Sequence, residues 1–191
     1  MPSFTDVILH MLYLQDLLQV EPLISVVYWT LCLELQFYLF YIFSLWFSSK
    51  VAGNKASLIN VLIVLCMGGY SILLDIGLLE SYVPGLFVSN WHYFLMGVLV
   101  CHVIRRTPYS HDVFMCWLLI EVFSQLITEV KPYIVAGIVC STGIYLMWRF
   151  ELLDKLFSGK LLAYLGTISY TLYLVHPDIG WKTIAFGKLL I

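Results

Sequence analysis

The sequence predicts an all-α fold, a polytopic membrane helix bundle of about six transmembrane helices with a short apolar segment before them. Of the 191 residues, 61% are hydrophobic and only 12% are charged, and the mean hydropathy is +0.92. A soluble domain carries about twice that charged fraction. Apolar windows close to the ~20 residues that a transmembrane helix needs recur along the chain. We therefore expect residues 1–191 to form a single integral membrane domain.

The first three predicted spans are separated by two short polar breaks. They cover Val26–Phe47, Leu58–Leu79 and Leu86–Ile104. The break before the second span reads SSKVAGNK, and the break before the third reads ESYVPG. Both breaks combine glycine with polar or charged residues, which favours turns.

The last three predicted spans are shorter than the first. They cover Val113–Thr128, Pro132–Phe150 and Leu161–Val175, after breaks that read RRTPYSHD, TEVKP and ELLDKLFSGK. Before the first span, Val7–Leu18 is apolar but too short for a typical span. Three placements fit this segment: in the membrane interface, as a re-entrant segment, or as the tail of a longer span. The C-terminal stretch Gly180–Ile191 is amphipathic.

Basic residues predict the orientation of these spans, because cytoplasmic loops of membrane proteins carry an excess of lysine and arginine. Seven basic residues fall in the breaks after the first, third and fifth spans, and three fall on the opposite side. The larger group, which we expect to face the cytoplasm, is Lys50, Lys55, Arg105, Arg106, Arg149, Lys155 and Lys160. This orientation brings Glu34, Asp75, His92 and His176 into the outer half of the bundle and predicts a polar cavity open to the outside.

Glu34 is the most unusual of these residues, because a charge near the bilayer centre costs about 3 kcal/mol on insertion scales. At helical spacing, Thr30, Glu34, Tyr38 and Tyr41 share one face, whose hydroxyl groups can hydrogen-bond a carboxyl group. Two interpretations fit: a functional acid, or a structural carboxyl group that joins two helices.

His176 precedes Pro177, and a residue before proline avoids the α region, so we expect the last helix to end there. With Ser169 and Tyr173 it forms a polar stripe at spacings of four and three. The alternative is an interfacial histidine that caps a helix end. Asp75 and His92 fall near span boundaries, where polar groups reach water easily. Glu121 falls inside a span and its role is left open.

Several classes of site are disfavoured. Basic residues are few and scattered, which argues against a nucleic-acid partner. The five cysteines all fall in apolar windows and are well separated, so we interpret them as small hydrophobic residues and expect neither disulfides nor a metal site. We interpret Arg105 and Arg106 first as topology determinants. The second interpretation is that they contact an anionic cofactor or a lipid headgroup. The cysteines are Cys32, Cys66, Cys101, Cys116 and Cys140.

Three segments resemble a known family. The stretch VYWTLCLELQFYLFY is similar to the signature of the acyltransferase-3 family of membrane O-acyltransferases, roughly W-S/T-L-x-x-E-x-Q-F-Y-L. YFLMGVLV is similar to its F-x-x-G helix start, through Phe94 and Gly97. GTISYTLYLVHPDIG, Gly166–Gly180, resembles its closing segment I-S-Y-S/T-L-Y-L-x-H. The residues that fill the first signature are Trp29, Thr30, Leu31, Glu34, Gln36, Phe37, Tyr38 and Leu39.

The resemblance implies an O-acyltransferase that moves an acyl group, often acetyl, from acyl-CoA onto a hydroxyl of a saccharide or lipid-linked glycan at the cell membrane of a bacterium. It implies Glu34 and His176 as catalytic residues, Glu34 orienting a histidine or a hydroxyl group. Arg105 and Arg106 would contact the CoA donor, and no metal is implied. The residues implied to contact substrate are Trp29, Thr30, Gln36, Tyr38, Ser169 and Tyr173, with Trp29 equally suited to an interfacial aromatic belt.

The chain departs from the family in one respect. Family members carry an arginine-and-histidine motif on their earliest helices, and we find no match to it, so we expect the chain to correspond to the C-terminal part of such a domain. Two rival functions remain: a multi-pass transporter, because buried acids and histidines also mark substrate paths and proton relays, and a non-catalytic remnant that still inserts into the membrane.

Overall fold

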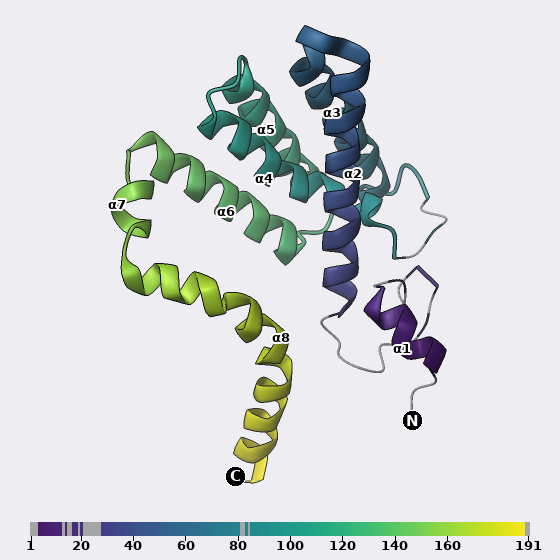
Figure 1. Cartoon of the computed structure of the whole chain (residues 1–191), viewed down its shortest axis with the longest axis vertical. Helices are drawn as coiled ribbons and strands as arrows, with labels where there is room; N and C mark the ends of the chain where they lie inside the picture. The colour runs from purple at the N-terminus through teal and green to yellow at the C-terminus, as the bar shows by residue number, and fades with distance from the viewer. Residues whose placement is uncertain are drawn as a thin grey trace.

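The computed structural model describes residues 4–12, 14, 17–18, 20, 28–80, 83 and 85–189, and all regular structure within them is helical (Figure 1). This confirms the all-α class. The α-helices are α1 (Phe4–Met11), α2 (Tyr28–Ala52), α3 (Ala56–Asp75), α4 (Trp91–Ile104), α5 (Ser110–Ile127), α6 (Pro132–Arg149), α7 (Leu153–Phe157) and α8 (Lys160–Leu189). Two 3₁₀ turns, η1 (Gly53–Lys55) and η2 (Phe87–Asn90), precede α3 and α4.

A helix forms at each of the six predicted positions. Three helical stretches among the described residues are long and apolar enough to cross a membrane: Trp29–Asp75, Phe87–Ile104 and Ser110–Ile127. The first of these contains both α2 and α3, which η1 joins into a hairpin. These stretches indicate a membrane protein, as the composition predicts.

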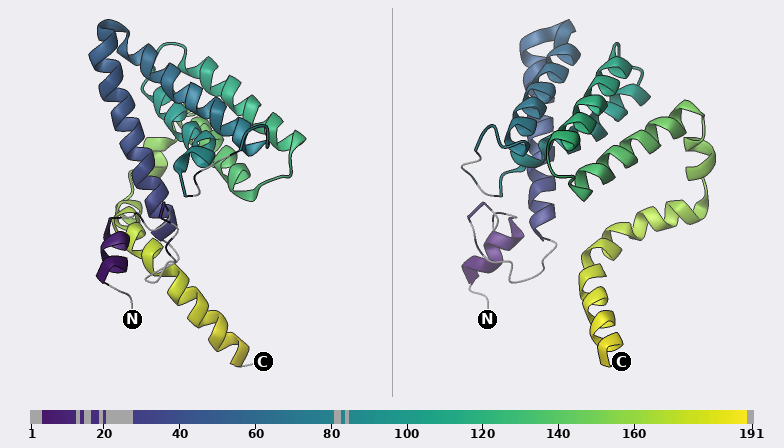
Figure 2. Two further views of the ribbon diagram at one scale, coloured as in Figure 1. Left: turned by 90° about the vertical axis from the view of Figure 1, so that its right-hand side faces the viewer. Right: turned by 180° about the vertical axis from the view of Figure 1, so that it is seen from behind.

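Helix α4 is the centre of the bundle. It packs against α3, α5 and α6, whereas α2 packs mainly against α3 (Figures 1 and 2). More than half of its residues are buried, whereas Gly97, Cys101 and Ile104 on one side of the helix are exposed. The buried residues of α4 are Trp91, His92, Leu95, Met96, Val98, Leu99, Val100 and Val103.

Aromatic rings hold α2 against the start of α4. The ring of Phe37 lies 5.0 Å from that of Trp91 and 4.9 Å from that of Phe94, measured between centroids. Phe40 meets Trp91 edge-on at 4.7 Å. Such offset and edge-on pairs are the favoured aromatic geometries. The indole N–H of Trp91 donates to the carbonyl oxygen of Val64 in α3 at 3.0 Å, so one side chain ties three helices together.

The last helix differs from the prediction. We expected it to end at His176, before Pro177, but α8 continues to Leu189, and its ribbon bends midway (Figure 1). Proline has no backbone N–H, so the carbonyl oxygen of Tyr173, four residues earlier, loses its helical partner. The Nδ1 atom of His176 lies 2.5 Å from that oxygen and takes its place. This replacement explains how the helix continues past the proline.

Gly68 in α3 permits the close packing of α3 on its neighbours. A Cβ atom there would lie 2.5 Å from Leu95 Cδ2 and 2.6 Å from Trp117 Cη2, which is closer than real contacts allow. At the neighbouring Gly69, an added Cβ would meet nothing within 4 Å. The two glycines therefore differ in packing although they are adjacent in sequence.

We predict that Gly68→Ala destabilises the bundle by about 1–3 kcal/mol, the usual range for overpacking. Gly69→Ala is the matched control and should be neutral or stabilise by up to about 1 kcal/mol, because alanine is the better helix former. The measurement is reversible unfolding of both variants in detergent. Equal stabilities for the two variants would contradict this packing.

Candidate functional site

A groove of about 900 Å³ lies along α2 and α4, with the start of α3 at one end. It extends along α2 from Phe37 to Ser49, about 18 Å at the helical rise of 1.5 Å per residue. Its walls are largely apolar near Phe37 and Phe94, and polar groups gather at the end formed by Arg105. The lining residues are Phe37, Tyr38, Tyr41, Leu45, Ser49, Ala56, Ser57, Asn60, Phe94, Gly97, Val98, Cys101, His102, Arg105 and Thr107.

One end of the groove meets Glu34. The hydroxyl group of Tyr38, a groove residue, donates to Glu34 Oε1 at 2.8 Å. Glu34 is half-buried and Tyr38 is 50% exposed, so the pair is accessible rather than sealed in the core. The two residues lie one turn apart on α2, as the sequence predicted. The Glu34 carboxylate is therefore connected to the groove through Tyr38.

The same end of α2 meets α8. The hydroxyl groups of Thr30 and Tyr173 contact each other, and the rings of Tyr173 and His176 lie 5.5 Å apart. A carbonyl oxygen only accepts hydrogen bonds, so the proton of His176 sits on Nδ1, facing Tyr173 O. In the neutral imidazole, Nε2 then carries the lone pair and is able to accept a proton. Thr30 of α2 and Tyr173 of α8 thus touch, and a pocket shared by Glu34 and His176 stays a prediction.

The two predicted cofactor arginines diverge. Arg105 lines the groove together with His102. Arg106 lines a separate cleft with Trp148 and Arg149. The backbone of Arg106 has φ 55°, in the left-handed region that ends a helix, and this turn directs the two side chains to different surfaces. One anionic ligand in the groove would meet Arg105.

Three other predicted residues occupy different surroundings. The side-chain amide of Gln36 donates to the carbonyl oxygen of Gly85 at 3.0 Å, and its oxygen accepts from Phe87 N–H at 3.0 Å, so it fastens the segment before α4 to α2. Ser169 donates to Gly166 O within its own helix. Trp29 is 47% exposed at the start of α2. Substrate contact by these side chains stays a prediction.

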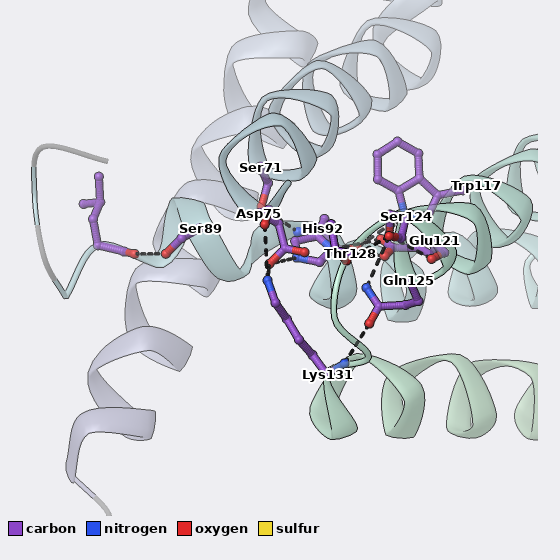
Figure 3. Close-up of polar contacts among 11 residues, drawn as sticks. Ser71, Asp75, Ser89, His92, Trp117, Glu121, Ser124, Gln125, Thr128 and Lys131 are labelled. Atoms are coloured by element: carbon purple, nitrogen blue, oxygen red, sulfur yellow. Dashed lines mark hydrogen bonds and ion pairs between the residues drawn. The ribbon is translucent and has the colours of Figure 1, made fainter. Parts of the chain in front are cut away.

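A second polar cluster lies inside the bundle, between α3, α4, α5 and the start of α6 (Figure 3). Glu121 and His92 are fully buried. His92 Nδ1 lies 3.1 Å from each oxygen of the Glu121 carboxylate, and Trp117 Nε1 donates to Glu121 Oε1 at 3.0 Å. The backbone N–H of His92 donates to the hydroxyl of Ser71 at 3.1 Å. The carboxylate is therefore held by donors from two helices.

The cluster continues to the end of α3. Lys131 Nζ lies 2.5 Å from Asp75 Oδ1, and His92 Nε2 lies 3.9 Å from the same oxygen. Lys131 also donates its backbone N–H to the side-chain oxygen of Gln125 at 2.9 Å. Asp75 Oδ1 thus pairs with the ammonium group of Lys131, whereas Asp75 Oδ2 and His92 Nε2 are buried without a hydrogen-bond partner among the described residues.

The four predicted ionisable residues therefore separate into two groups. Asp75 and His92 join the buried cluster, whereas Glu34 and His176 remain near the contact between α2 and α8. Sequence reasoning missed Glu121 and Lys131 as partners of His92 and Asp75. The available signal was the spacing of four between Trp117 and Glu121, which puts an indole donor and a carboxylate on one helix face.

Among the described residues, no group of three or more histidine, cysteine, aspartate or glutamate side chains is arranged to hold a metal ion. No family model, curated protein or solved structure matches the chain.

We predict that Glu121→Gln destabilises the bundle by about 1–3 kcal/mol, because the amide replaces one of the two carboxyl oxygens that face His92 and Trp117 with an NH₂ donor and leaves a buried donor without an acceptor. Glu129→Gln is the matched control: Glu129 is exposed in the turn after α5, and its replacement should change stability by less than about 0.5 kcal/mol. The measurement is the free energy of unfolding of both variants in the same detergent. A Glu121 variant as stable as the control would contradict a paired, buried carboxylate.

Proposed function

We propose that the chain is part of a membrane-embedded O-acyltransferase that transfers an acyl group from acyl-CoA to a hydroxyl of a saccharide or cell-envelope glycan. The observation that carries the proposal is the groove along α2 and α4, which joins Tyr38, bonded to Glu34, with Arg105. By the resemblance to the acyltransferase-3 family, the Arg105 end would bind acyl-CoA, and the end with Tyr38 and Glu34 would bind the acceptor. No metal takes part in this proposal.

The proposed topology has six membrane crossings, by α2, α3, α4, α5, α6 and the first part of α8. The basic connections after α2, α4 and α6 would then face the cytoplasm of a bacterial cell, in keeping with the excess of lysine and arginine there. Arg105 would lie at the cytoplasmic end of the groove, where soluble acyl-CoA arrives. Tyr38 and Glu34 would lie nearer the outer side, where the glycan is modified.

The reaction needs a base near the acceptor hydroxyl group. The acceptor oxygen attacks the thioester carbonyl carbon while its proton passes to the base, and the base returns this proton to sulfur as the C–S bond breaks, which releases CoA as the thiol. The lone pair on His176 Nε2 suits the role of base, and the tautomer is set by the Nδ1 contact to Tyr173 O. Glu34 would orient a histidine or a hydroxyl group, as the acid does in a catalytic triad. Hydroxyl groups lie nearby: that of Tyr38 is bonded to Glu34, and those of Thr30 and Tyr173 contact each other.

A second candidate is proton-coupled transport, and the buried cluster of Asp75, His92, Glu121 and Lys131 favours it. Chains of such groups inside membrane helices mark proton relays. Acidification of proteoliposomes that carry the chain, abolished by Asp75→Asn, would be the sign of transport. The groove favours the transferase, because Glu34 is hydrogen-bonded to the groove residue Tyr38, whereas the buried cluster does not line the groove.

We predict that Glu34→Gln lowers acyl transfer at least about 100-fold, the lower range for losing a group that assists proton transfer. The assay measures the base-labile radioactive acetyl groups that pass from labelled acetyl-CoA to the envelope glycan of cells that express the chain. Glu80→Gln, an exposed carboxylate outside the groove, is the matched control and should retain full labelling. Undiminished labelling with correctly folded Glu34→Gln would make Glu34 a structural residue.

A further inference from the structure

A second hollow, of about 700 Å³, lies where α4, α6 and α7 end, and the proposed function does not use it. We name it the α6–α7 cleft. Three of its lining residues are basic, two are acidic and three are apolar. The lining residues are Ile104, Arg106, Trp148, Arg149, Glu151, Leu153, Asp154 and Lys155.

We propose that the α6–α7 cleft binds the phosphate headgroup of an anionic phospholipid. The cations that would hold the phosphate are Arg106, Arg149 and Lys155. Within the part of the chain that the structure describes, no ion pair joins any of the three to a carboxylate, although Glu151 and Asp154 line the same cleft. Their donors are thus available to a ligand. A guanidinium group can donate two parallel hydrogen bonds to two oxygens of one phosphate, so Arg106 and Arg149 suit a phosphate ligand.

Two helix ends at the cleft have an unusual backbone conformation. Arg106 and Glu151 follow the ends of α4 and α6 in the left-handed conformation, with φ 55° and 56°. Such helix ends normally take glycine, since residues with a Cβ atom are strained there. The hydrogen bonds Thr107 N–H to His102 O, at 3.1 Å, and Leu152 N–H to Met147 O, at 2.8 Å, complete both helix ends. At the end of α4, the residue in this strained conformation is Arg106, whose side chain lines the cleft.

The surroundings of the cleft favour a lipid over a soluble anion. Phe150, Leu156 and Phe157 next to it are 65%, 52% and 54% exposed. Exposed aromatic and aliphatic side chains beside cations suit the boundary between headgroups and acyl chains. Basic hollows between membrane helices at the cytoplasmic side are known to take anionic headgroups. Trp148 lines the cleft and is a residue type enriched at that depth.

The test uses the full chain in detergent and counts retained lipid by native mass spectrometry after exposure to phosphatidylglycerol or phosphatidylcholine. The double variant Arg106→Gln/Arg149→Gln should bind phosphatidylglycerol about 30-fold more weakly, since each basic side chain contributes roughly fivefold to the affinity for an anionic surface. Lys50→Gln/Lys55→Gln removes the same charge from the α2–α3 connection and should change binding less than about twofold.

Two further arms distinguish a lipid site from a purely structural charge cluster and from a site for CoA. Glu151→Gln should strengthen phosphatidylglycerol binding, because it removes a negative charge from the lining, whereas the loss of a structural charge would weaken binding or unfold the chain. Acetyl-CoA should not displace the lipid. The proposal is overturned if both double variants lose binding equally, if phosphatidylcholine is retained equally well, or if acetyl-CoA rather than lipid depends on Arg106 and Arg149. None of these readouts depends on acyl transfer, so failure here leaves the proposed function standing.

Discussion

The buried carboxylate of Glu121 is the constraint on which the bundle depends. A charge in an apolar interior must be paired and hydrogen-bonded, or it destabilises the fold by several kcal/mol. His92 of α4 and Trp117 of α5 supply the donors. Trp117 reaches this place only because Gly68 of α3 has no side chain in its way. The contacts of this carboxylate therefore link α4 with α5, and the pair of Lys131 with Asp75 links α3 with the start of α6.

The fixed position of α4 also shapes the groove. One side of α4 carries His92 into the core, while Phe94, Gly97, Cys101 and Arg105 follow at spacings of three and four and line the groove. Gly97 leaves room on this wall, since an added Cβ would meet nothing within 4 Å. One rigid helix therefore serves both the polar cluster and the candidate site. A binding wall on a well-packed helix is held in place more tightly than one on a loop.

The sequence predicted the positions of the helices better than the side-chain contacts between them. Hydropathy was sufficient to locate six helices, because the apolar windows and their polar breaks are local features. The prediction from Pro177 that the last helix ends at His176 was wrong: the helix continues, and His176 bonds the carbonyl group that the proline frees. The Glu34–Tyr38 contact was predictable, since it lies within one helix turn. The pairing of His92 with Glu121 spans 29 residues and depends on helix register, which no local pattern contains.

Occupation of the groove by acyl-CoA is the step on which the proposed transferase rests, and Cys101 offers a direct measurement of it. Cys101 lines the groove and is exposed, whereas Cys116 is exposed on α5 and outside the groove lining. The measurement is the rate of alkylation of each cysteine with and without acetyl-CoA, in the native sequence and in Gly97→Leu, which fills the groove. We expect acetyl-CoA to protect Cys101 but not Cys116, and Gly97→Leu to remove this dependence. Equal alkylation of Cys101 with and without acetyl-CoA, in a folded protein, would contradict binding of the donor in this groove.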